Sequence, residues 1–294
     1  MTQFQNPKPR SGICQKSRLI IPRFSLLLAM FASPIMANFT FAQEQEIEFP
    51  DLKIEANYKN LVEEHNNDKD KKKPWPEGLD SYKIRFIRLQ HDGQGWDDGM
   101  RATNADVNLL QHFAKSTGID QVASKSESHR IGLLAKYPRD GFPPFVFLTG
   151  NHKMGRISQK DMKVLREYCL GGGLLIADAG SPQFHQSFIH LMRMVFPGKK
   201  MLDIADDDTL YQKPFAFPDG APAFWGHGGR RALGIKHEGR WVVFYHPGDM
   251  NDAWKNEGYT DVTPEMKESA LNLGVNLLLY SFESWDLAIA KAIK

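Results

Sequence analysis

Imidazole, carboxyl and amide side chains recur in this sequence where apolar runs give way to glycine, proline or asparagine. They are His91 and Asp92, Asn151 and His152, Asp178 and His185, and His246, Asp249 and Asp252. Imidazole and carboxyl groups can bind zinc or another divalent cation, and they can act as general acid and base. No compact signature such as His-Glu-x-x-His or Cys-x-x-Cys is present. This chemistry therefore depends on a fold that brings distant residues together.

A loop of unusual composition adds a second candidate feature. The segment Trp225-Gly-His-Gly-Gly-Arg-Arg231 combines an indole ring, the imidazole of His227 and two cations. Trp96, Trp225 and Trp254 all fall in predicted loops, where exposed aromatic rings often line carbohydrate or peptide grooves. We therefore interpret the loop at Trp225 and His227 as a candidate lid over the same set of polar residues.

Each of these polar residues also has a structural interpretation. His91-Asp92-Gly93 and the segment from His246 to Asp249 have the composition of turns. Asp178 can accept hydrogen bonds from loop amides, and His185 lies in the first turn of a helix, where it can simply be solvated. The sequence therefore indicates a candidate binding rim. It predicts no cofactor, with a divalent metal as the alternative.

The elements that must position these side chains alternate between strand and helix from residue 82 to residue 197. Leu174 to Ala177 is wholly apolar, which is typical of a central parallel strand covered on both faces. Gly171 is expected to end the preceding helix in the left-handed conformation, and Ser181-Pro182 supplies an N-cap and a first-turn proline for the next helix. Since ligands bind at the carboxyl ends of strands in such sheets, Asp178 marks the expected site.

The remaining segments complete an α/β pattern. Strands are expected at 82–90, at 121–124 or 130–134, at 144–150 and at 201–205, with a hairpin from 232 to 246 around Glu238-Gly239. Helices are expected after a capping box at Thr103–Asp106, and from 158, 182 and 263. This order predicts a doubly wound, mostly parallel sheet with a C-terminal β-hairpin and a final helix.

The first part of the chain differs from the rest. Residues 1–42 carry five basic side chains and no acid, with an apolar core from Phe24 to Ala37 and a small residue, Ala42, at the end. This is typical of a secretory signal, cleaved after Ala42 or, as the second choice, after Ala37. Residues 43–80 are charged and interpreted as a tether or arm, and residues 81–294 as one α/β domain. We therefore expect a periplasmic or secreted protein.

Charge and cysteine content narrow the functional classes. Removal of five cations with the signal changes the formal net charge from +2 to −3, so a nucleic-acid partner loses its main support. Cleavage also removes Cys14 and leaves Cys169 alone, without an internal disulfide. Cys169 falls on the apolar face of a predicted helix, where we expect a buried, unreactive thiol. An apolar segment of about fourteen residues is too short for a stable membrane span.

Residues 81–285 resemble a bacterial family, the domain of unknown function 4159. The resemblance rests on four segments: Tyr82 to Leu89 followed by Trp96, Phe145 to Gly150, Gly172 to Asp178, and Gly239 to Trp254, of which the last is the most specific. It implies a flavodoxin-like sheet similar to that of class I glutamine amidotransferases. It implies no established activity.

The amidotransferase resemblance also implies a test for catalysis. Related enzymes carry a nucleophile on a tight turn after a strand, and a histidine partner follows later in the chain. Here the comparable turn is Asp178-Ala-Gly-Ser181, which contains no cysteine, and Ser181 fits better as an N-cap. We therefore predict a noncatalytic domain that binds a small molecule, a carbohydrate or a protein. The alternative is a hydrolase, metal-assisted in one version, with Asp178 or His246 as base or ligand.

Overall fold

A seven-stranded sheet organises the part of the chain that the structure describes. The computed structural model describes residues 83–100, 103–137, 142–224, 231–256 and 262–293. The strand order is β2-β1-β3-β4-β7-β6-β5. The strands are β1 (Ile87–Gln90), β2 (Glu127–Arg130), β3 (Phe145–Leu148), β4 (Leu174–Asp178), β5 (Leu202–Asp203), β6 (Leu233–His237) and β7 (Arg240–His246).

The sheet is parallel from β2 to β7 and antiparallel beyond it. β4 pairs in parallel with β3 on one side and with β7 on the other, and all five of its residues are buried. This confirms Leu174 to Ala177 as an interior parallel strand. β6 and β5 follow as antiparallel strands, and β6 joins β7 through a turn in which Glu238 has φ 48° and Gly239 has φ 78°. The predicted hairpin is confirmed, and its second strand lies inside the sheet.

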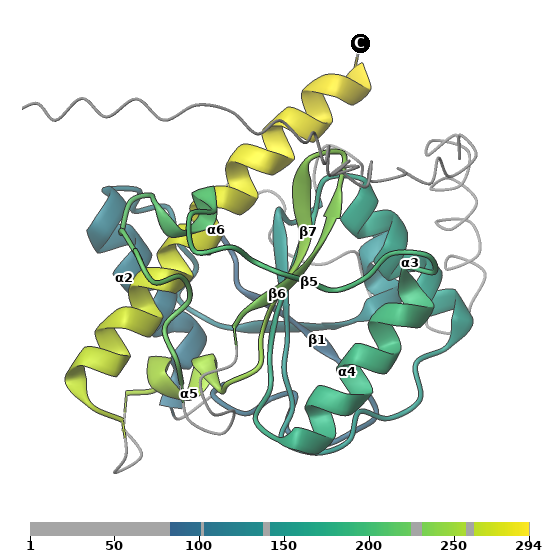
Figure 1. The fold of residues 1–294 in the computed structure, drawn as a ribbon, viewed down its shortest axis with the longest axis horizontal. Helices are drawn as coiled ribbons and strands as arrows, with labels where there is room; N and C mark the ends of the chain where they lie inside the picture. The colour runs from purple at the N-terminus through teal and green to yellow at the C-terminus, as the bar shows by residue number, and fades with distance from the viewer. Residues whose placement is uncertain (1–82, 101–102, 138–141, 225–230, 257–261, 294) are drawn as a thin grey trace, which may run out of the picture. The chain divides into compact units, whose positions relative to one another are not determined.

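Helices cover both faces of this sheet, as the alternating pattern predicts. They are α2 (Ala105–Thr117), α3 (Gln159–Leu170), α4 (Pro182–Val195), α5 (Met250–Trp254) and α6 (Pro264–Ile293), with short 3-10 helices η3 (Ile131–Lys136) and η4 (Thr209–Tyr211). α2, α5 and α6 cover one face, and α3 and α4 cover the other (Figure 1). The described residues thus form the predicted α/β, doubly wound, flavodoxin-like architecture.

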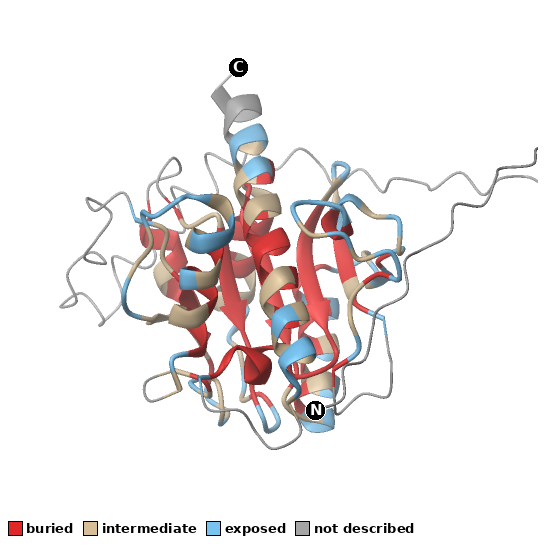
Figure 2. Cartoon of the chain, turned by 90° about the vertical axis from the view of Figure 1, so that its left-hand side faces the viewer, coloured by how far each residue is buried: buried red, intermediate tan, exposed pale blue. Residues whose placement is uncertain are grey.

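Two hydrophobic cores result because strand side chains alternate between the faces. Ile87, Leu89, Val146 and Leu148 pack on the side of α3 and α4. Phe86, directly before β1, and Phe145 and Phe147 of β3 pack on the side of α2 and α6. Figure 2 shows the inner strands buried between partly exposed helices. Cys169 belongs to the first core and is fully buried, as expected.

Several local predictions are confirmed and others are wrong. The side chain of Ser181 accepts a hydrogen bond from the amide of Phe184, which confirms the N-cap of α4. Gly171 has φ −74°, so the left-handed residue after α3 is instead Gly172, with φ 131°. The second strand forms at Glu127–Arg130 and shares only Arg130 with the second predicted range. In the first predicted range, Val122 makes an isolated parallel bridge with Ile84.

The capping box predicted at Thr103–Asp106 is also wrong. α2 begins after Asn104, which has φ 50° and whose side chain makes no capping hydrogen bond. Asp106 is buried and accepts hydrogen bonds from Arg88 instead. The ion pair between Asp106 and the buried Arg88 therefore takes precedence over a capping interaction at the start of α2.

The C-terminal part contains two helices, of which only the second was predicted. α5 is a single short helix directly after β7, and α6 runs for 30 residues to the end of the described chain. Trp254, expected in an exposed loop, is only 1% exposed and packs in the core under α6. No helix in the described ranges is both long and apolar enough to cross a membrane.

Candidate functional site

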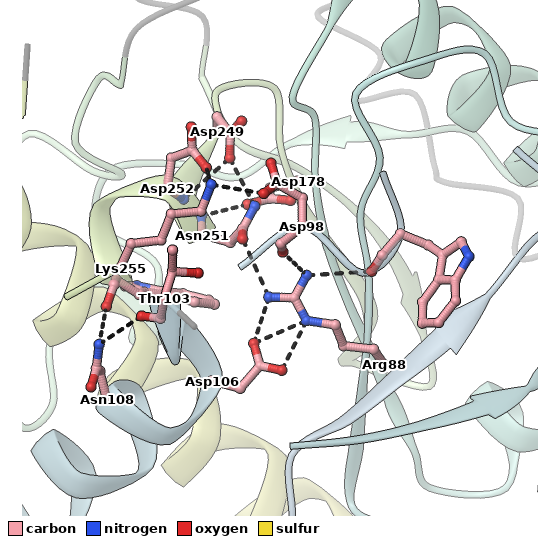
Figure 3. A network of polar contacts seen from close by, with 12 residues as sticks. Arg88, Asp98, Thr103, Asp106, Asn108, Asp178, Asp249, Asn251, Asp252 and Lys255 are labelled. Atoms are coloured by element: carbon pink, nitrogen blue, oxygen red, sulfur yellow. Dashed lines mark hydrogen bonds and ion pairs between the residues drawn. The ribbon is translucent and has the colours of Figure 1, made fainter. Parts of the chain in front are cut away.

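The parallel strands end at one edge of the sheet, and a buried carboxylate cluster lies there. We define the carboxylate cluster by its five acids and three partners: Asp98, Asp106, Asp178, Asp249 and Asp252, with Arg88, Asn251 and Lys255 (Figure 3). These residues come from β1, the loop after it, α2, the end of β4, and the segment from β7 through α5. Three of the predicted residues, Asp178, Asp249 and Asp252, are therefore brought together.

Arg88 is the central cation of the carboxylate cluster. It stands in β1 with none of its surface exposed, and its guanidinium lies 5.1 Å from the ring centre of Phe147. Its Nε donates to both carboxylate oxygens of Asp106, at 3.0 and 2.9 Å, and Nη2 donates to Asp106 Oδ1 at 2.5 Å. A bidentate pair of this kind satisfies two buried charges at once.

Asn251 links this cation to Asp178 and Asp249. Its side-chain oxygen accepts from Arg88 Nη2 at 3.2 Å, and its Nδ2 donates to Asp249 Oδ1 at 2.8 Å. Its backbone amide donates to Asp178 Oδ2 at 2.7 Å. One asparagine in the first turn of α5 thus connects β1, the end of β4 and the N-cap of α5 (Figure 3).

A second ion pair closes the outer side of the cluster. Lys255 Nζ lies 2.9 Å from Asp98 Oδ1 and also pairs with Asp252. The lysine side chain is 3% exposed, whereas that of Asp98 is 31% exposed. Both cations of the cluster therefore have acidic partners.

The carboxylate cluster contains more acids than cations, and the pKa values of three of its acids, Asp178, Asp249 and Asp252, are raised. Burial raises the pKa of Asp178 to about 7, against the opposing charge of Arg88. Burial also raises the pKa of Asp249 well above its usual range, and the nearby charges of Asp178 and Asp252 add to this. Oδ1 of Asp178 has no hydrogen-bond partner among the described residues. The pair of Asp178 and Asp249 therefore holds a proton near neutral pH.

Two predicted histidines are bonded to the backbone through both ring nitrogens. Nδ1 of His91 accepts from the amide of Gly93 at 3.0 Å, so Nε2 carries the proton and donates to the carbonyl of Thr149 at 2.9 Å. Burial also lowers the pKa of His91. Nδ1 of His246 accepts from the amide of Gly248 and Nε2 donates to the carbonyl of Pro222, each at 2.9 Å. Both rings hold loops in place.

The other predicted residues are more dispersed. Asp92 is exposed and pairs with Arg130 at 3.2 Å. Asn151 and His152 are exposed and bond to each other at 2.7 Å between Oδ1 and Nδ1. His185 Nδ1 lies 2.8 Å from the hydroxyl of Tyr245. Trp225 and His227 lie outside the described residues.

The described residues offer neither a metal cluster nor an activated serine or cysteine. Within the ranges described above, no three His, Cys, Asp or Glu side chains are placed to share a metal ion. Ser181 caps α4, and its Oγ lies 3.1 Å from the amide of Phe184. Burial raises the pKa of the Cys169 thiol to about 12. The carboxylate cluster can thus hold and exchange a proton, whereas the Ser181 hydroxyl is used as a helix cap and the Cys169 thiol is buried and protonated.

The sequence indicated three of the acids, Asp178, Asp249 and Asp252. It did not indicate Asp98 or Asp106 as site residues, nor the three partners Arg88, Asn251 and Lys255. Arg88 could have been found from its own position, because a cation at an inward-facing position of a strand needs a buried counter-charge. Asn251 and Lys255 carried no comparable signal, since their roles depend on the turn that places α5 beside β4.

Comparison with known proteins supports the sequence resemblance. A search of curated proteins found no match. The family model described as domain of unknown function (DUF4159) matches residues 85–282. That range includes β1 to β7 and every member of the carboxylate cluster. Because the match covers more than half of the sequence, this chain belongs to the DUF4159 family.

Proposed function

We propose that this chain is a secreted or periplasmic domain that binds a ligand or partner without catalysing its conversion, on an amidotransferase-like fold that lacks the nucleophile. The observation that carries the proposal is the turn after β4. Asp178 is fully buried there, Ala179 and Gly180 have no reactive group, and Ser181 caps α4. An acyl-transfer enzyme needs an attacking group at such a turn, with a base beside it.

The histidines support the same proposal. A general base must reach the proton that it abstracts. His91 and His246 instead use both ring nitrogens for backbone hydrogen bonds, which fix the loops after β1 and β7. Cys169 lies in the core between the sheet and α3, with its thiol pKa raised by burial.

The test is a turnover screen with a matched variant. The purified chain is incubated with amide, ester and glycoside substrates, and the Asp178→Asn variant is assayed beside it after circular dichroism confirms its fold. We expect no turnover by either protein. Turnover by the wild type that disappears in folded Asp178→Asn contradicts the proposal.

Secretion is tested separately. Expression of the full chain with a C-terminal tag in a bacterial host, followed by fractionation and N-terminal sequencing, is expected to give an exported protein that begins at Gln43. A start at Asn38 would indicate the second cleavage site. A cytoplasmic protein that retains Met1 would contradict export.

One observation favours a second candidate function, a hydrolase. A carboxyl group with a pKa of about 7, such as Asp178, can both accept and donate a proton at neutral pH. The turnover screen decides between the two functions. Metal analysis of the purified chain tests the metal-assisted version, for which stoichiometric zinc or manganese is the supporting result.

A further inference from the structure

A small cavity lies at the carboxyl ends of β1 and β2, away from the acids of the carboxylate cluster. We call it the β1 pocket. It has a volume of about 160 Å³, and its polar wall includes Gln90, Asp92, Arg130, Lys136, Arg156 and Asp161. Asp92, Arg156 and Ile157 also line a larger groove of about 1700 Å³ that runs along α3 and α4. The pocket therefore opens next to a longer surface.

The place of the pocket in the sheet favours ligand binding. β1 lies between β2 and β3, so the chain leaves β1 in one direction and returns past it to form β3. Such a reversal of strand order opens a crevice at the carboxyl ends of the strands, where α/β sheets bind ligands.

Two glycines bring the walls of the pocket together. A Cβ at Gly93 would lie 2.5 Å from the carbonyl oxygen of Lys153, and a Cβ at Gly155 would lie 2.6 Å from Cβ of Asp92. The loops after β1 and β3 are therefore in backbone contact. This contact places Asp92 and Arg156 next to each other in the wall of the β1 pocket.

The charges of the pocket are not balanced within the protein. Arg130 pairs with Asp92, and Asp161 accepts a hydrogen bond from Ser158 at 2.7 Å. Lys136 is only 8% exposed. Neither the side chain of Lys136 nor that of Arg156 has an ion pair or hydrogen bond in the described ranges. Since lysine is seldom buried without a counter-charge, an anion is the partner that this pocket lacks.

We propose that the β1 pocket binds the carboxylate or phosphate group of a small ligand, held by Lys136 and Arg156. This rests on the proposed binding function and names its ligand class. A volume of about 160 Å³ is close to that of a cavity that holds one benzene-sized molecule, so the pocket takes one anionic group. The rest of the ligand extends along the groove, where Lys153, Lys160 and Lys163 add positive charge.

The proposal is tested by calorimetric titration of the purified full chain with inorganic phosphate and, separately, with succinate. We expect saturable binding of at least one probe. Lys136→Met and Arg156→Gln should each weaken it about tenfold, because each removes one charged hydrogen-bond donor. The matched control is Lys115→Gln on α2, an exposed cation on the opposite face of the sheet, which should leave binding unchanged.

Arg156 is exposed, so its variant keeps the test valid if Lys136→Met fails to fold. Absence of saturable binding of both probes overturns the proposal, as does an equal loss in Lys115→Gln, which would indicate a general charge effect. A preference between the probes identifies which anion the pocket takes. Failure here, in a chain without turnover, leaves the binding function standing, whereas turnover that depends on Asp178 overturns that function.

Discussion

Two charged regions share the carboxyl edge of this sheet, and they differ in how their cations are paired. In the carboxylate cluster, Arg88 and Lys255 both contact acids, and the acids outnumber them. In the β1 pocket, Arg130 is paired, but Lys136 and Arg156 have no partner in the described chain. The first region joins elements of the domain to one another, and the second retains positive charge for a ligand. Whether a cation has an acidic partner within the protein, more than its residue type, therefore distinguishes the structural cations from the ligand-binding ones.

The largest expected effect is on stability, in the carboxylate cluster. Arg88→Met should reduce the free energy of unfolding by about 3 to 5 kcal/mol, because it leaves Asp106 buried without its partner. Urea denaturation measures this loss. Arg88→Lys, which keeps the charge but not the bidentate geometry, should lose less. A fully stable Arg88→Met variant would show that the cluster does not hold the domain together.

The second prediction concerns pH. Burial raises the pKa of Asp178 from 3.8 to about 7, so the folded chain keeps a proton that the unfolded chain releases. The resulting stabilisation is complete below pH 4 and is lost as the pH rises to about 7, with a size on the order of 4 kcal/mol.

The Asp178→Asn variant should lack this dependence, so its free energy of unfolding should fall less between pH 4 and pH 7. Urea denaturation across that range measures the difference. The control is Asp92→Asn, since the Asp92 side chain is 61% exposed. An Asp178→Asn curve parallel to that of the wild type would contradict the raised pKa.

The third prediction concerns the walls of the β1 pocket. Gly155→Ala would place a methyl group against Cβ of Asp92, so the loops after β1 and β3 must separate. We expect a loss of about 1 to 3 kcal/mol in unfolding free energy, and weaker phosphate binding. Gly118→Ala is the matched control, because a Cβ there meets no atom within 4 Å. Its own cost comes from a φ of 74° alone. Unchanged phosphate binding by Gly155→Ala would separate the loop contact from the pocket.

The smallest effect is expected at the exposed ion pair of the pocket. Arg130→Met should change the free energy of unfolding by less than about 1 kcal/mol, because both side chains of the Arg130–Asp92 pair are more than half exposed. Urea denaturation beside Arg88→Met compares the same substitution in the two regions. Similar losses in both variants would remove the distinction on which the comparison depends.

Local patterns in the sequence were sufficient to predict most of the fold. The apolar run of β4, the Ser181-Pro182 start of α4 and the turn at Glu238-Gly239 are encoded by adjacent residues, and all three form as predicted. Predictions at Thr103 and Gly171 were wrong. The capping box does not form because Asp106 accepts hydrogen bonds from the distant Arg88. After α3, the positive φ occurs one residue later than predicted, at Gly172.

The candidate site was less predictable because its contacts are distant in sequence. Asp178 and Asp249 could be placed at one edge from strand order alone. That His91 and His246 would bond to backbone carbonyls could not be predicted, because those carbonyls belong to Thr149 and Pro222 in other loops. The burial of Trp254 likewise follows from a short helix that the turn chemistry around Asp249 did not indicate.

The position of β7 has a consequence for how the chain acquires its structure. β4 is complete by residue 178, but the partner for one of its edges, β7, begins only at Arg240. A nascent chain therefore carries an unprotected and mostly apolar strand edge until the hairpin is made, and such edges recruit other chains. Aggregation through the edge of β4 is therefore favoured in the interval between the synthesis of these two strands.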